Sequence, residues 1–556
     1  CFMMMEVVGD VLLPYMLAKI INQGIAERNV AYIIKIGAIM GFIAVIMAVG
    51  GVLGAWFASK AAMNFGADLR MDLFEKIQQF SFQNIDNFST GSLITRLTND
   101  ITQIQNMIMM TLRMCLRSPG ILIGAMVMAF VISPKLAAIF IIVLPVLAVL
   151  IVVIMRRAFP QFRTLQGKLD ALNSCIQEGL VGIRLIKSFV RGDYEEMRFE
   201  KRNQQLKEAN LTAMKTMLLY TPLMTLALNI TTVVVVWSGG NMIVAGNMQV
   251  GDLTAFTNYI VQIMSSLTML SIAFLNWARA IASFRRVGEV LDEKIDLTDE
   301  NAKHKDRAVC EGSVEFQNVS FRYYKNSPEW VIENISFKLE AGKTLGIIGP
   351  TGSGKSTLVS MIPRLYDTDE GTVLVDGINV RDYGLKPLRE GIGMVLQNNT
   401  LFSGSITENL KWGDEHADEK AVRKAAQNAQ AAGFIDSFKD GYRTRLEQSG
   451  NNVSGGQKQR LCIARALLKC PKILILDDST SAVDTATERA IREALHSEYK
   501  DMTKIIIAQR IRSVMDADEI LVLDNGKTAG FGTHEQLLAD CPVYREIYDV
   551  QNGREE

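Results

Sequence analysis

The feature that most constrains this chain is an apolar run at residues 136–155, which reads LAAIFIIVLPVLAVLIVVIM. A helix of this length rises about 1.5 Å per residue and crosses a hydrocarbon core of about 30 Å. Similar runs occur at residues 31–57, 107–132, 217–238 and 253–281, and such repetition is not expected of buried helices in a soluble protein. Residues 1–21 resemble a further span that contains Glu6 and Asp10. We therefore predict six membrane-spanning helices.

The first span begins without an initiator methionine, so we expect the true start to lie upstream of the sequence. A signal peptide is disfavoured because neither a basic segment nor a small-residue cleavage site is present. Residues 156–215 are rich in Lys and Arg, whereas residues 239–251 contain none. Because positively charged loops remain cytoplasmic, we expect both chain ends and the polar helical stretches 58–106 and 156–215 in the cytoplasm.

Composition supports the membrane assignment and excludes other classes. Hydrophobic residues make up 49% of the chain, and the mean hydropathy is +0.15. Lys plus Arg equals Asp plus Glu at 59 each, whereas a nucleic-acid-binding protein would carry a basic excess. The seven cysteines form no CxxC pair, so neither a zinc site nor a disulfide framework is expected, and reduced thiols fit a cytosol-facing protein.

The character of the sequence changes after residue 290. We predict a transmembrane domain at residues 1–290, a linker at 291–312, and a soluble α/β domain at 313–556, where short β-rich runs alternate with helical ones. Glycines at residues 91 and 192 interrupt the polar helical stretches, as in a turn between antiparallel helices. Residues 87–97 and 187–199 are therefore candidate contact points for another domain.

The α/β domain contains a phosphate-binding pattern. GPTGSGKS, at residues 349–356, follows the apolar run TLGII and satisfies GxxxxGK[ST] in the required strand, loop and helix order. Glycines let backbone N–H groups turn toward phosphate oxygens, Lys355 supplies a positive charge, and Ser356 is a candidate Mg²⁺ ligand. A simple glycine-rich turn would not require Lys-Ser at the start of the helix.

Two further motifs accompany the phosphate loop. ILILDD places Asp477 at the end of an apolar strand, where its carboxylate can join the Mg²⁺ coordination shell. An acidic strand end is a weak signal alone, and the phosphate loop strengthens it. VSGGQ, at residues 453–457, begins a helix just before that strand, and this combination is specific.

With these motifs the chain resembles the exporters of the ATP-binding cassette (ABC) family over essentially its whole length. The resemblance implies the type I/IV ABC exporter fold: a six-helix α-helical transmembrane domain with long cytoplasmic helix extensions, fused to an α/β P-loop nucleotide-binding domain. It also implies cytoplasmic nucleotide binding at a bacterial plasma membrane, with ATP and Mg²⁺ as cofactors. In the family, coupling helices lie where this chain has residues 87–97 and 187–199.

The resemblance also assigns site residues. Gln397 in MVLQNN corresponds to the Q-loop, SAVD at residues 481–484 to the D-loop, and Tyr323 to the aromatic residue that stacks on adenine, with Tyr324 as a competitor. The implied metal ligands are Ser356, Gln397 and Asp477. The implied nucleotide-binding residues are Tyr323, Gly349, Pro350, Thr351, Gly352, Ser353, Gly354, Lys355, Ser356, Thr357, Gln397, Asp477, Ser454, Gly455, Gly456 and Gln457.

Two positions depart from the family pattern. Asp478 stands where the family has a catalytic glutamate, and its shorter side chain withdraws the carboxylate by about 1 Å, a displacement that costs on the order of a hundredfold in a positioned reaction. Gln509 stands at the switch-histidine position and offers no imidazole. An active site that tolerates Asp and Gln at these positions is the weaker explanation. Both changes affect the same step, ATP hydrolysis, which favours a degenerate site.

The family closes two nucleotide domains head to tail, so each chain provides two half-sites. A self-pair would place Asp478 and Gln509 in both composite sites. We therefore predict a heterodimer in which a non-identical partner supplies the productive Walker motifs and faces this VSGGQ segment. The alternatives are a homodimeric exporter that tolerates Asp and Gln, and an ATP-gated channel or nucleotide-sensing regulator. An importer is disfavoured, because importers usually place the two domain types on separate chains.

The transported compound is not readable from the spans. Their charged residues are candidates to line a cavity or to extend toward the helix ends, and they are Glu6, Asp10, Lys19, Arg113 and Arg117. On family resemblance we expect an amphipathic drug, lipid or peptide.

Overall fold

The computed structural model describes residues 2–325 and 327–552, except for the side chains of residues 274–276, 278 and 279. The chain divides into two compact units. The first consists of Cys1–Ile77 and Gly91–Asp292, and the second of Gln78–Thr90 and Glu293–Glu556. The short segment Gln78–Thr90 therefore belongs with the second unit, although it lies within the range predicted for the transmembrane domain.

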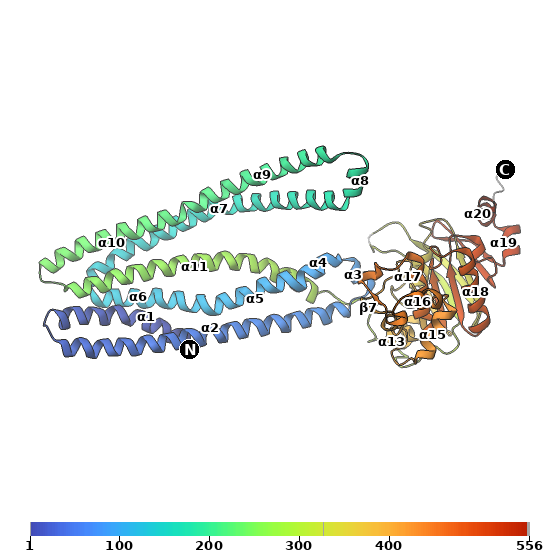
Figure 1. The fold of residues 1–556 in the computed structure, drawn as a ribbon, viewed down its shortest axis with the longest axis horizontal. Coiled ribbons are helices and arrows are strands. Elements are labelled where there is room, and N and C mark those ends of the chain that lie inside the picture. The colour runs from blue at the N-terminus through green and yellow to red at the C-terminus, as the bar shows by residue number, and fades with distance from the viewer. Residues whose placement is uncertain (1, 326, 553–556) are drawn as a thin grey trace. The chain divides into compact units, whose positions relative to one another are not determined.

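The first unit is a bundle of long helices (Figure 1). Its described elements are α1 (Phe2–Lys19), η1 (Ile20–Ile25), α2 (Val30–Gln78), α4 (Thr90–Thr95), η2 (Arg96–Asp100), α5 (Ile101–Met110), η3 (Thr111–Cys115), α6 (Leu116–Ile132), α7 (Pro134–Val181), α8 (Ile183–Ser188), α9 (Gly192–Leu218), α10 (Tyr220–Val244) and α11 (Val250–Leu291).

Five helical stretches of the described chain are long and apolar enough to cross a membrane. They are Val30–Gln78, Thr90–Ile132, Pro134–Val181, Gly192–Val244 and Val250–Ala273. Each contains all or most of one predicted apolar run. The sixth predicted span corresponds to α1, which has 18 residues and contains Glu6, Asp10 and Lys19. It is thus an apolar helix of the bundle that carries three charged side chains within 18 residues.

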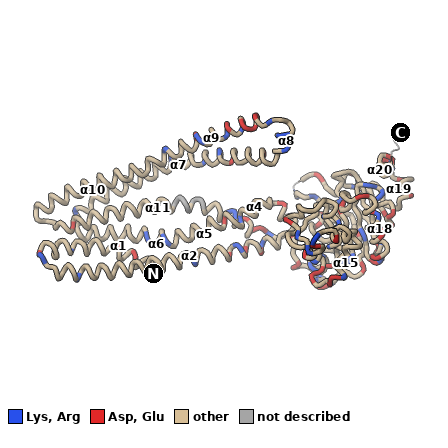
Figure 2. Tube along the Cα trace, viewed as in Figure 1, with Lys and Arg blue, Asp and Glu red and all other residues tan. Residues whose placement is uncertain are grey.

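Local sequence explains where these helices begin and how far their apolar surface extends. Ser133 accepts a hydrogen bond from the backbone N–H of Leu136. Pro134 occupies the first turn of α7, where a backbone N–H has no partner within the helix, so the N–H that proline lacks is not needed. Figure 2 shows charged residues along α9 and none along α10. The helical stretch Gly192–Val244, formed by α9 and α10, therefore changes from a polar to an apolar surface along its length.

The core of the first unit joins α1, α7 and α11. Phe140 and Phe256 stack with ring centroids 5.5 Å apart. The hydroxyl of the buried Tyr259 donates a hydrogen bond to the carbonyl oxygen of Val11 at 2.7 Å. Gln262 Nε2 donates to the carbonyl oxygen of Asp10 at 2.8 Å. These contacts place α1 inside the bundle despite its charged residues.

The second unit contains three described sheets. A four-stranded antiparallel sheet has the order β2-β1-β4-β5, a six-stranded sheet has the order β12-β11-β3-β10-β9-β6, and a two-stranded antiparallel sheet pairs β7 with β8. The strands are β1 (Val314–Phe321), β2 (Ile332–Leu339), β3 (Thr344–Ile348), β4 (Glu370–Val375), β5 (Ile378–Asn379), β6 (Ile392–Val395), β7 (Gly404–Ser405), β8 (Arg445–Leu446), β9 (Ile473–Asp477), β10 (Thr503–Ile507), β11 (Glu519–Asp524) and β12 (Lys527–Gly532).

The six-stranded sheet is parallel except at its β12 edge. The strands of a parallel sheet are buried on both faces, which explains apolar runs such as ILILD in β9. The helices of this unit are α3 (Phe82–Asp86), α12 (Lys355–Ser360), α13 (Leu385–Glu390), α14 (Ile406–Leu410), α15 (Glu419–Asn428), α16 (Ala432–Ser437), α17 (Gly455–Leu468), α18 (Thr485–Glu498), α19 (His534–Asp540) and α20 (Pro542–Asn552), with the short 3-10 turns η4 (Val380–Asp382), η5 (Gly441–Arg443), η6 (Gln448–Gly450) and η7 (Ile511–Ser513).

The short helix α3 is held to the rest of the second unit by polar and aromatic contacts. Asn84 Nδ2 donates to Glu293 Oε1 at 3.2 Å and to the carbonyl oxygen of Lys294 at 2.9 Å. The Tyr366 hydroxyl donates to Asp86 Oδ2 at 2.9 Å. These contacts lie just before residues 87–97, the stretch that the sequence marked as a candidate contact point.

Candidate functional site

The phosphate-loop sequence connects β3 to α12. Its strand lies in the interior of the six-stranded sheet. Gly354 precedes α12 with φ +90°, a left-handed conformation that glycine adopts without strain. A Cβ at this position would lie 2.9 Å from the carbonyl oxygen of Val331. The shape of the loop therefore depends on glycine at residue 354.

Lys355 folds back onto the loop. Its Nζ donates hydrogen bonds to the carbonyl oxygens of Gly349 at 2.8 Å and Pro350 at 2.7 Å. Burial lowers the pKa of Lys355, and the carboxylates of Asp478 and Asp477 oppose that shift. Carbonyl oxygens are neutral acceptors, so an anionic oxygen entering the loop would be a stronger partner for this ammonium group.

Ser356 and Asp477 meet at the end of β9. Ser356 Oγ donates to Asp477 Oδ1 at 2.8 Å, and Asp477 is buried. Burial raises the pKa of Asp477, and the hydrogen bond from Ser356 acts in the opposite direction. A hydroxyl and a carboxylate are oxygen donors of the kind that Mg²⁺ prefers. No group of three His, Cys, Asp or Glu side chains suited to a metal occurs among the described residues.

The two residues that depart from the family pattern contact each other. Gln509 Nε2 donates a hydrogen bond to Asp478 Oδ2 at 2.8 Å. Asp478 has φ +46° and follows β9 directly. Burial raises its pKa, whereas hydrogen bonds from Gln509 and Gln397 oppose the shift. The Asp478 carboxylate is thus engaged by amide groups, one of them on the segment that follows β10.

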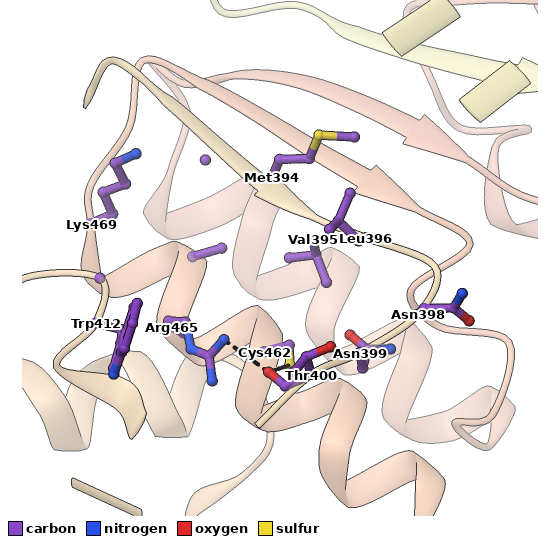
Figure 3. A pocket seen from close by; sticks show the side chains of 13 residues that line it. Met394, Val395, Leu396, Asn398, Asn399, Thr400, Trp412, Cys462, Arg465 and Lys469 are labelled. Atoms are coloured by element: carbon purple, nitrogen blue, oxygen red, sulfur yellow. Dashed lines mark hydrogen bonds between the residues drawn. The ribbon is translucent and has the colours of Figure 1, made fainter. Parts of the chain in front are cut away.

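The segment after Gln397 borders a separate pocket of about 240 Å³, shown in Figure 3. Residues of β6 form one side and residues of α17 the other. Arg465 Nη1 donates to the carbonyl oxygen of Thr400 at 3.1 Å, and Cys462 Sγ approaches the same oxygen at 3.9 Å. These contacts tie the Gln397 segment to the helix that begins with the VSGGQ motif.

Tyr323 lies at the phosphate-loop helix and Tyr324 does not. The hydroxyls of Tyr323 and Thr357 are hydrogen-bonded at 2.9 Å. The Tyr323 ring makes edge contacts with Phe321 at 5.1 Å and with Tyr366 at 5.3 Å. Tyr324 is 75% exposed. Of the two competing tyrosines, Tyr323 is therefore the one positioned beside the phosphate loop.

The VSGGQ segment caps a different helix. Ser454 Oγ accepts a hydrogen bond from the backbone N–H of Gln457, and Gln457 Oε1 accepts one from the backbone N–H of Ser454. This capping box starts α17. A Cβ on Gly456 would lie 2.8 Å from the carbonyl oxygen of Ala482, so glycine allows α17 to approach the 481–484 segment.

The predicted site residues therefore form two groups. The first contains the phosphate loop with Tyr323, Gln397, Asp477, Asp478 and Gln509. The second contains Ser454 to Gln457, of which Ser454, Gly455 and Gly456 border a pocket of about 420 Å³ together with Ala482, Val483 and Asp484. No direct hydrogen bond between described residues joins the Ser454–Gln457 segment to the phosphate loop.

Two residues of this region have no counterpart in the sequence prediction. Gln459 Oε1 accepts a hydrogen bond from the backbone N–H of Ala482 at 3.0 Å, and its Nε2 donates to Ser481 Oγ at 3.3 Å. Tyr366 contacts both Tyr323 and Phe82. Neither residue lies in a recognisable pattern, because its partners are distant in sequence. The one sequence signal was the position of Gln459, which lies two residues after the VSGGQ motif.

In the first unit, three of the five charged span residues named above form an ion cluster. Arg117 Nη2 lies 3.0 Å from Glu6 Oε1 and 3.0 Å from Asp10 Oδ2. Arg113 is exposed, and Lys19 Nζ lies 4.8 Å from the ring centre of Tyr15. The acidic residues of α1 are thus paired with α6, which accounts for their presence in an apolar bundle.

Comparison with known proteins agrees with both units. The chain matches the model of the ABC transporter transmembrane region over residues 1–267 and the ABC transporter model over residues 332–481. It is 40% identical to the uncharacterized ABC transporter ATP-binding protein YfiB of Bacillus subtilis (strain 168), over 100% of this chain and 96% of that protein. It is 37% identical to the uncharacterized ABC transporter ATP-binding protein MT1311 of Mycobacterium tuberculosis (strain CDC 1551 / Oshkosh), over 99% and 95% of the two chains.

A solved structure of an ABC exporter has a similar fold. The structure of a bacterial Atm1-family ABC exporter with ATP bound superposes with a TM-score of 0.82 at 25% identity, covering 99% of this chain and 97% of that one. A helical membrane unit fused to a P-loop domain of this topology defines an ABC exporter, an integral protein of the plasma membrane. This chain belongs to the ABC transporter family.

Proposed function

We propose that this chain is one half of an ATP-driven heterodimeric exporter. In this role, its own phosphate loop holds ATP with little hydrolysis, and its VSGGQ segment completes the active site of a non-identical partner. The observation that carries the proposal is the hydrogen bond of 2.8 Å between Gln509 Nε2 and Asp478 Oδ2. This bond links the two residues, Asp478 and Gln509, that differ from the family pattern.

ATP binding is assigned to the first group of site residues. The backbone N–H groups of the 349–357 loop would cradle the phosphates, Lys355 would exchange its carbonyl partners for phosphate oxygens, and Tyr323 would stack on adenine. Ser356, Asp477 and Gln397 would hold Mg²⁺, whose charge offsets that of the phosphates.

The Asp478 carboxylate is a poor general base in this arrangement. It is one methylene shorter than glutamate, and amide hydrogen bonds already engage it. A general base must lie within hydrogen-bond reach of the water that it activates. Gln509 holds this carboxylate and provides no group that titrates near neutral pH. Both features favour binding over hydrolysis at this chain's own site.

The second group of residues remains suited to a productive site. Ser454, Gly455 and Gly456 begin the 14-residue helix α17, whose first N–H groups favour an anion, and they border the open pocket beside Asp484. A partner with glutamate and histidine at the two departing positions would supply the hydrolytic half. Closure of the two nucleotide domains on ATP would then drive transport of an amphipathic drug, lipid or peptide out of the cytoplasm.

Copurification from the native host tests the heterodimer. Tagged chain should retain a second, distinct ABC half-transporter, and replacing the catalytic glutamate of that partner by glutamine should abolish ATP turnover of the pair. Lys355→Ala in this chain should weaken its own ATP binding and leave the partner's half-site intact. Rapid ATP hydrolysis by this chain alone, or turnover that survives the partner's Glu→Gln change, would contradict the proposal in favour of a homodimeric exporter.

A further inference from the structure

A large cavity lies in the second unit, apart from the nucleotide-binding residues. Its volume is about 940 Å³, and residues of α18, η7, α20 and β10 line its walls. None of the residues assigned above to ATP or Mg²⁺ lines it. A cavity of this size accommodates a drug-sized organic molecule.

The cavity contains more cations than carboxylates. Arg489 pairs with Glu493 at 2.8 Å, and Arg492 with Asp516 at 3.4 Å. The two remaining lining cations, Lys504 and Arg512, form no ion pair with any residue of the described chain. The polar wall therefore carries an excess of positive charge.

Lys504 is the most unusual of these groups. It lies on β10, lines the cavity and is only 5% exposed. Burial lowers its pKa against the smaller effects of Asp518 and Asp501, and Asp518 is already paired with Lys343 at 2.9 Å. Among the described residues no carboxylate lies within ion-pair distance of Lys504, so an anion bound in the cavity would supply the missing counterion.

The rest of the wall is apolar. Leu495, Ile506, Ile511, Met515 and Tyr548 line the cavity. A pocket that combines a few placed charges with apolar side chains suits a ligand with one charged group and an apolar body.

We propose that this cavity binds an amphipathic organic anion, whose acidic group contacts Lys504 and Arg512 and whose apolar body packs against Leu495, Ile511 and Tyr548. The site goes beyond the proposed transport function, because it neither overlaps the phosphate loop nor lies in the membrane unit.

The cavity walls are hydrogen-bonded to the segment that contains Gln509. Gln551 of α20 accepts a hydrogen bond from the backbone N–H of Ile511 and donates one to the carbonyl oxygen of Gln509, both at 2.8 Å. Arg492 Nη1 donates to the carbonyl oxygen of Arg512 at 2.6 Å. A bound anion would therefore hold the segment from Gln509 to Arg512 in place, which makes the cavity a candidate regulatory site.

The test uses the full chain in detergent with saturating ADP, so that the phosphate loop is occupied. The probe is 2-naphthoate, with neutral 2-naphthamide as the matched compound, and saturation-transfer NMR gives the dissociation constants. We expect 2-naphthoate to bind at least tenfold more tightly than 2-naphthamide. Lys504→Met should remove that preference, whereas Lys439→Met, at an exposed lysine elsewhere in the unit, should preserve it.

Arg512→Gln provides a second variant at an exposed position, where folding is not at risk. It should weaken 2-naphthoate binding threefold to tenfold and leave 2-naphthamide unchanged. Hydrogen exchange of Ile511–Ser513 should slow with 2-naphthoate and not with 2-naphthamide. Equal binding of the two compounds, or binding of 2-naphthoate that is unaffected by either cavity variant, would overturn the proposal. This readout needs no ATP hydrolysis, so its failure would leave the transport proposal standing.

Discussion

At the residue scale, this site departs from the family pattern at two positions. Asp478 has one methylene group fewer than the family's glutamate, and Gln509 lacks the imidazole ring of the family's histidine. The sequence alone indicated that both residues act on the same step. It did not indicate that they contact each other, because 31 positions separate them in the chain. Their contact arises because β9 and β10 are parallel neighbours, so that their carboxyl ends meet at one edge of the sheet.

Restoring the family residues should restore hydrolysis. We expect Asp478→Glu to raise ATP turnover of the purified chain about tenfold to a hundredfold, because the carboxylate regains about 1 Å of reach toward the attacking water. Adding Gln509→His should raise it further. Phosphate release measures the effect, and Lys355→Ala in the same background should abolish it. An Asp478→Glu chain no faster than the wild type would show that residue 478 does not limit hydrolysis.

The two tyrosines of FRYY should differ in their effect on nucleotide affinity. Aromatic stacking on a base contributes about 1–3 kcal/mol, so Tyr323→Ala should weaken ATP binding roughly fivefold to a hundredfold. Tyr324→Ala is the matched control and should leave affinity unchanged, because Tyr324 is 75% exposed. Fluorescence titration with a nucleotide analogue measures both. The reverse order of effects would assign the stacking role to Tyr324.

At the scale of elements, the turn between β3 and α12 combines backbone strain with close packing. Gly354 has φ +90°, and an added Cβ would lie 2.9 Å from a carbonyl oxygen. Gly352 has a similar φ of +86°, but an added Cβ there meets no atom within 4 Å. A side chain at residue 352 would therefore meet only an unfavourable φ, whereas a side chain at residue 354 would meet both an unfavourable φ and a steric clash.

Alanine substitution should reveal that difference. Gly352→Ala should cost about 1–3 kcal/mol from strain alone, whereas Gly354→Ala should cost more, because the Val331 carbonyl must also move. Thermal unfolding of the full chain measures both, at about 2–4 °C per kcal/mol for a domain of this size. Equal shifts for the two variants would show that the Val331 contact is readily relaxed.

Gly91 and Gly192 do not themselves end a helix. The sequence predicts breaks in the helical pattern within residues 87–97 and 187–199, and the chain leaves helix within both ranges, but Gly91 itself lies in the first turn of α4 and Gly192 begins α9. The chain leaves helix a few residues earlier, between α3 and α4 and between α8 and α9. Glycine is tolerated near a helix start, so the position of the break depends on capping and on packing.

At the scale of the whole molecule, the pump and channel hypotheses predict different fluxes. In inside-out vesicles that contain the chain and its proposed partner, we expect ATP to drive accumulation of an amphipathic dye against its gradient, because the family couples domain closure to alternating access. A non-hydrolysable ATP analogue should not sustain accumulation. Dye flux that only follows its gradient, whichever nucleotide is present, would favour the channel or sensor alternative.

The sequence by itself determined the two-part organisation and the chemistry of the phosphate loop. Both depend on residues that are contiguous in the chain: apolar runs long enough to span a bilayer, and a glycine loop followed by Lys-Ser. Only the tertiary structure decided the contact of Gln509 with Asp478, the pairing of Glu6 and Asp10 with Arg117, and the position of Lys504 in the wall of a cavity. These features depend on which distant segments become neighbours, and that choice is made by packing of the folded chain.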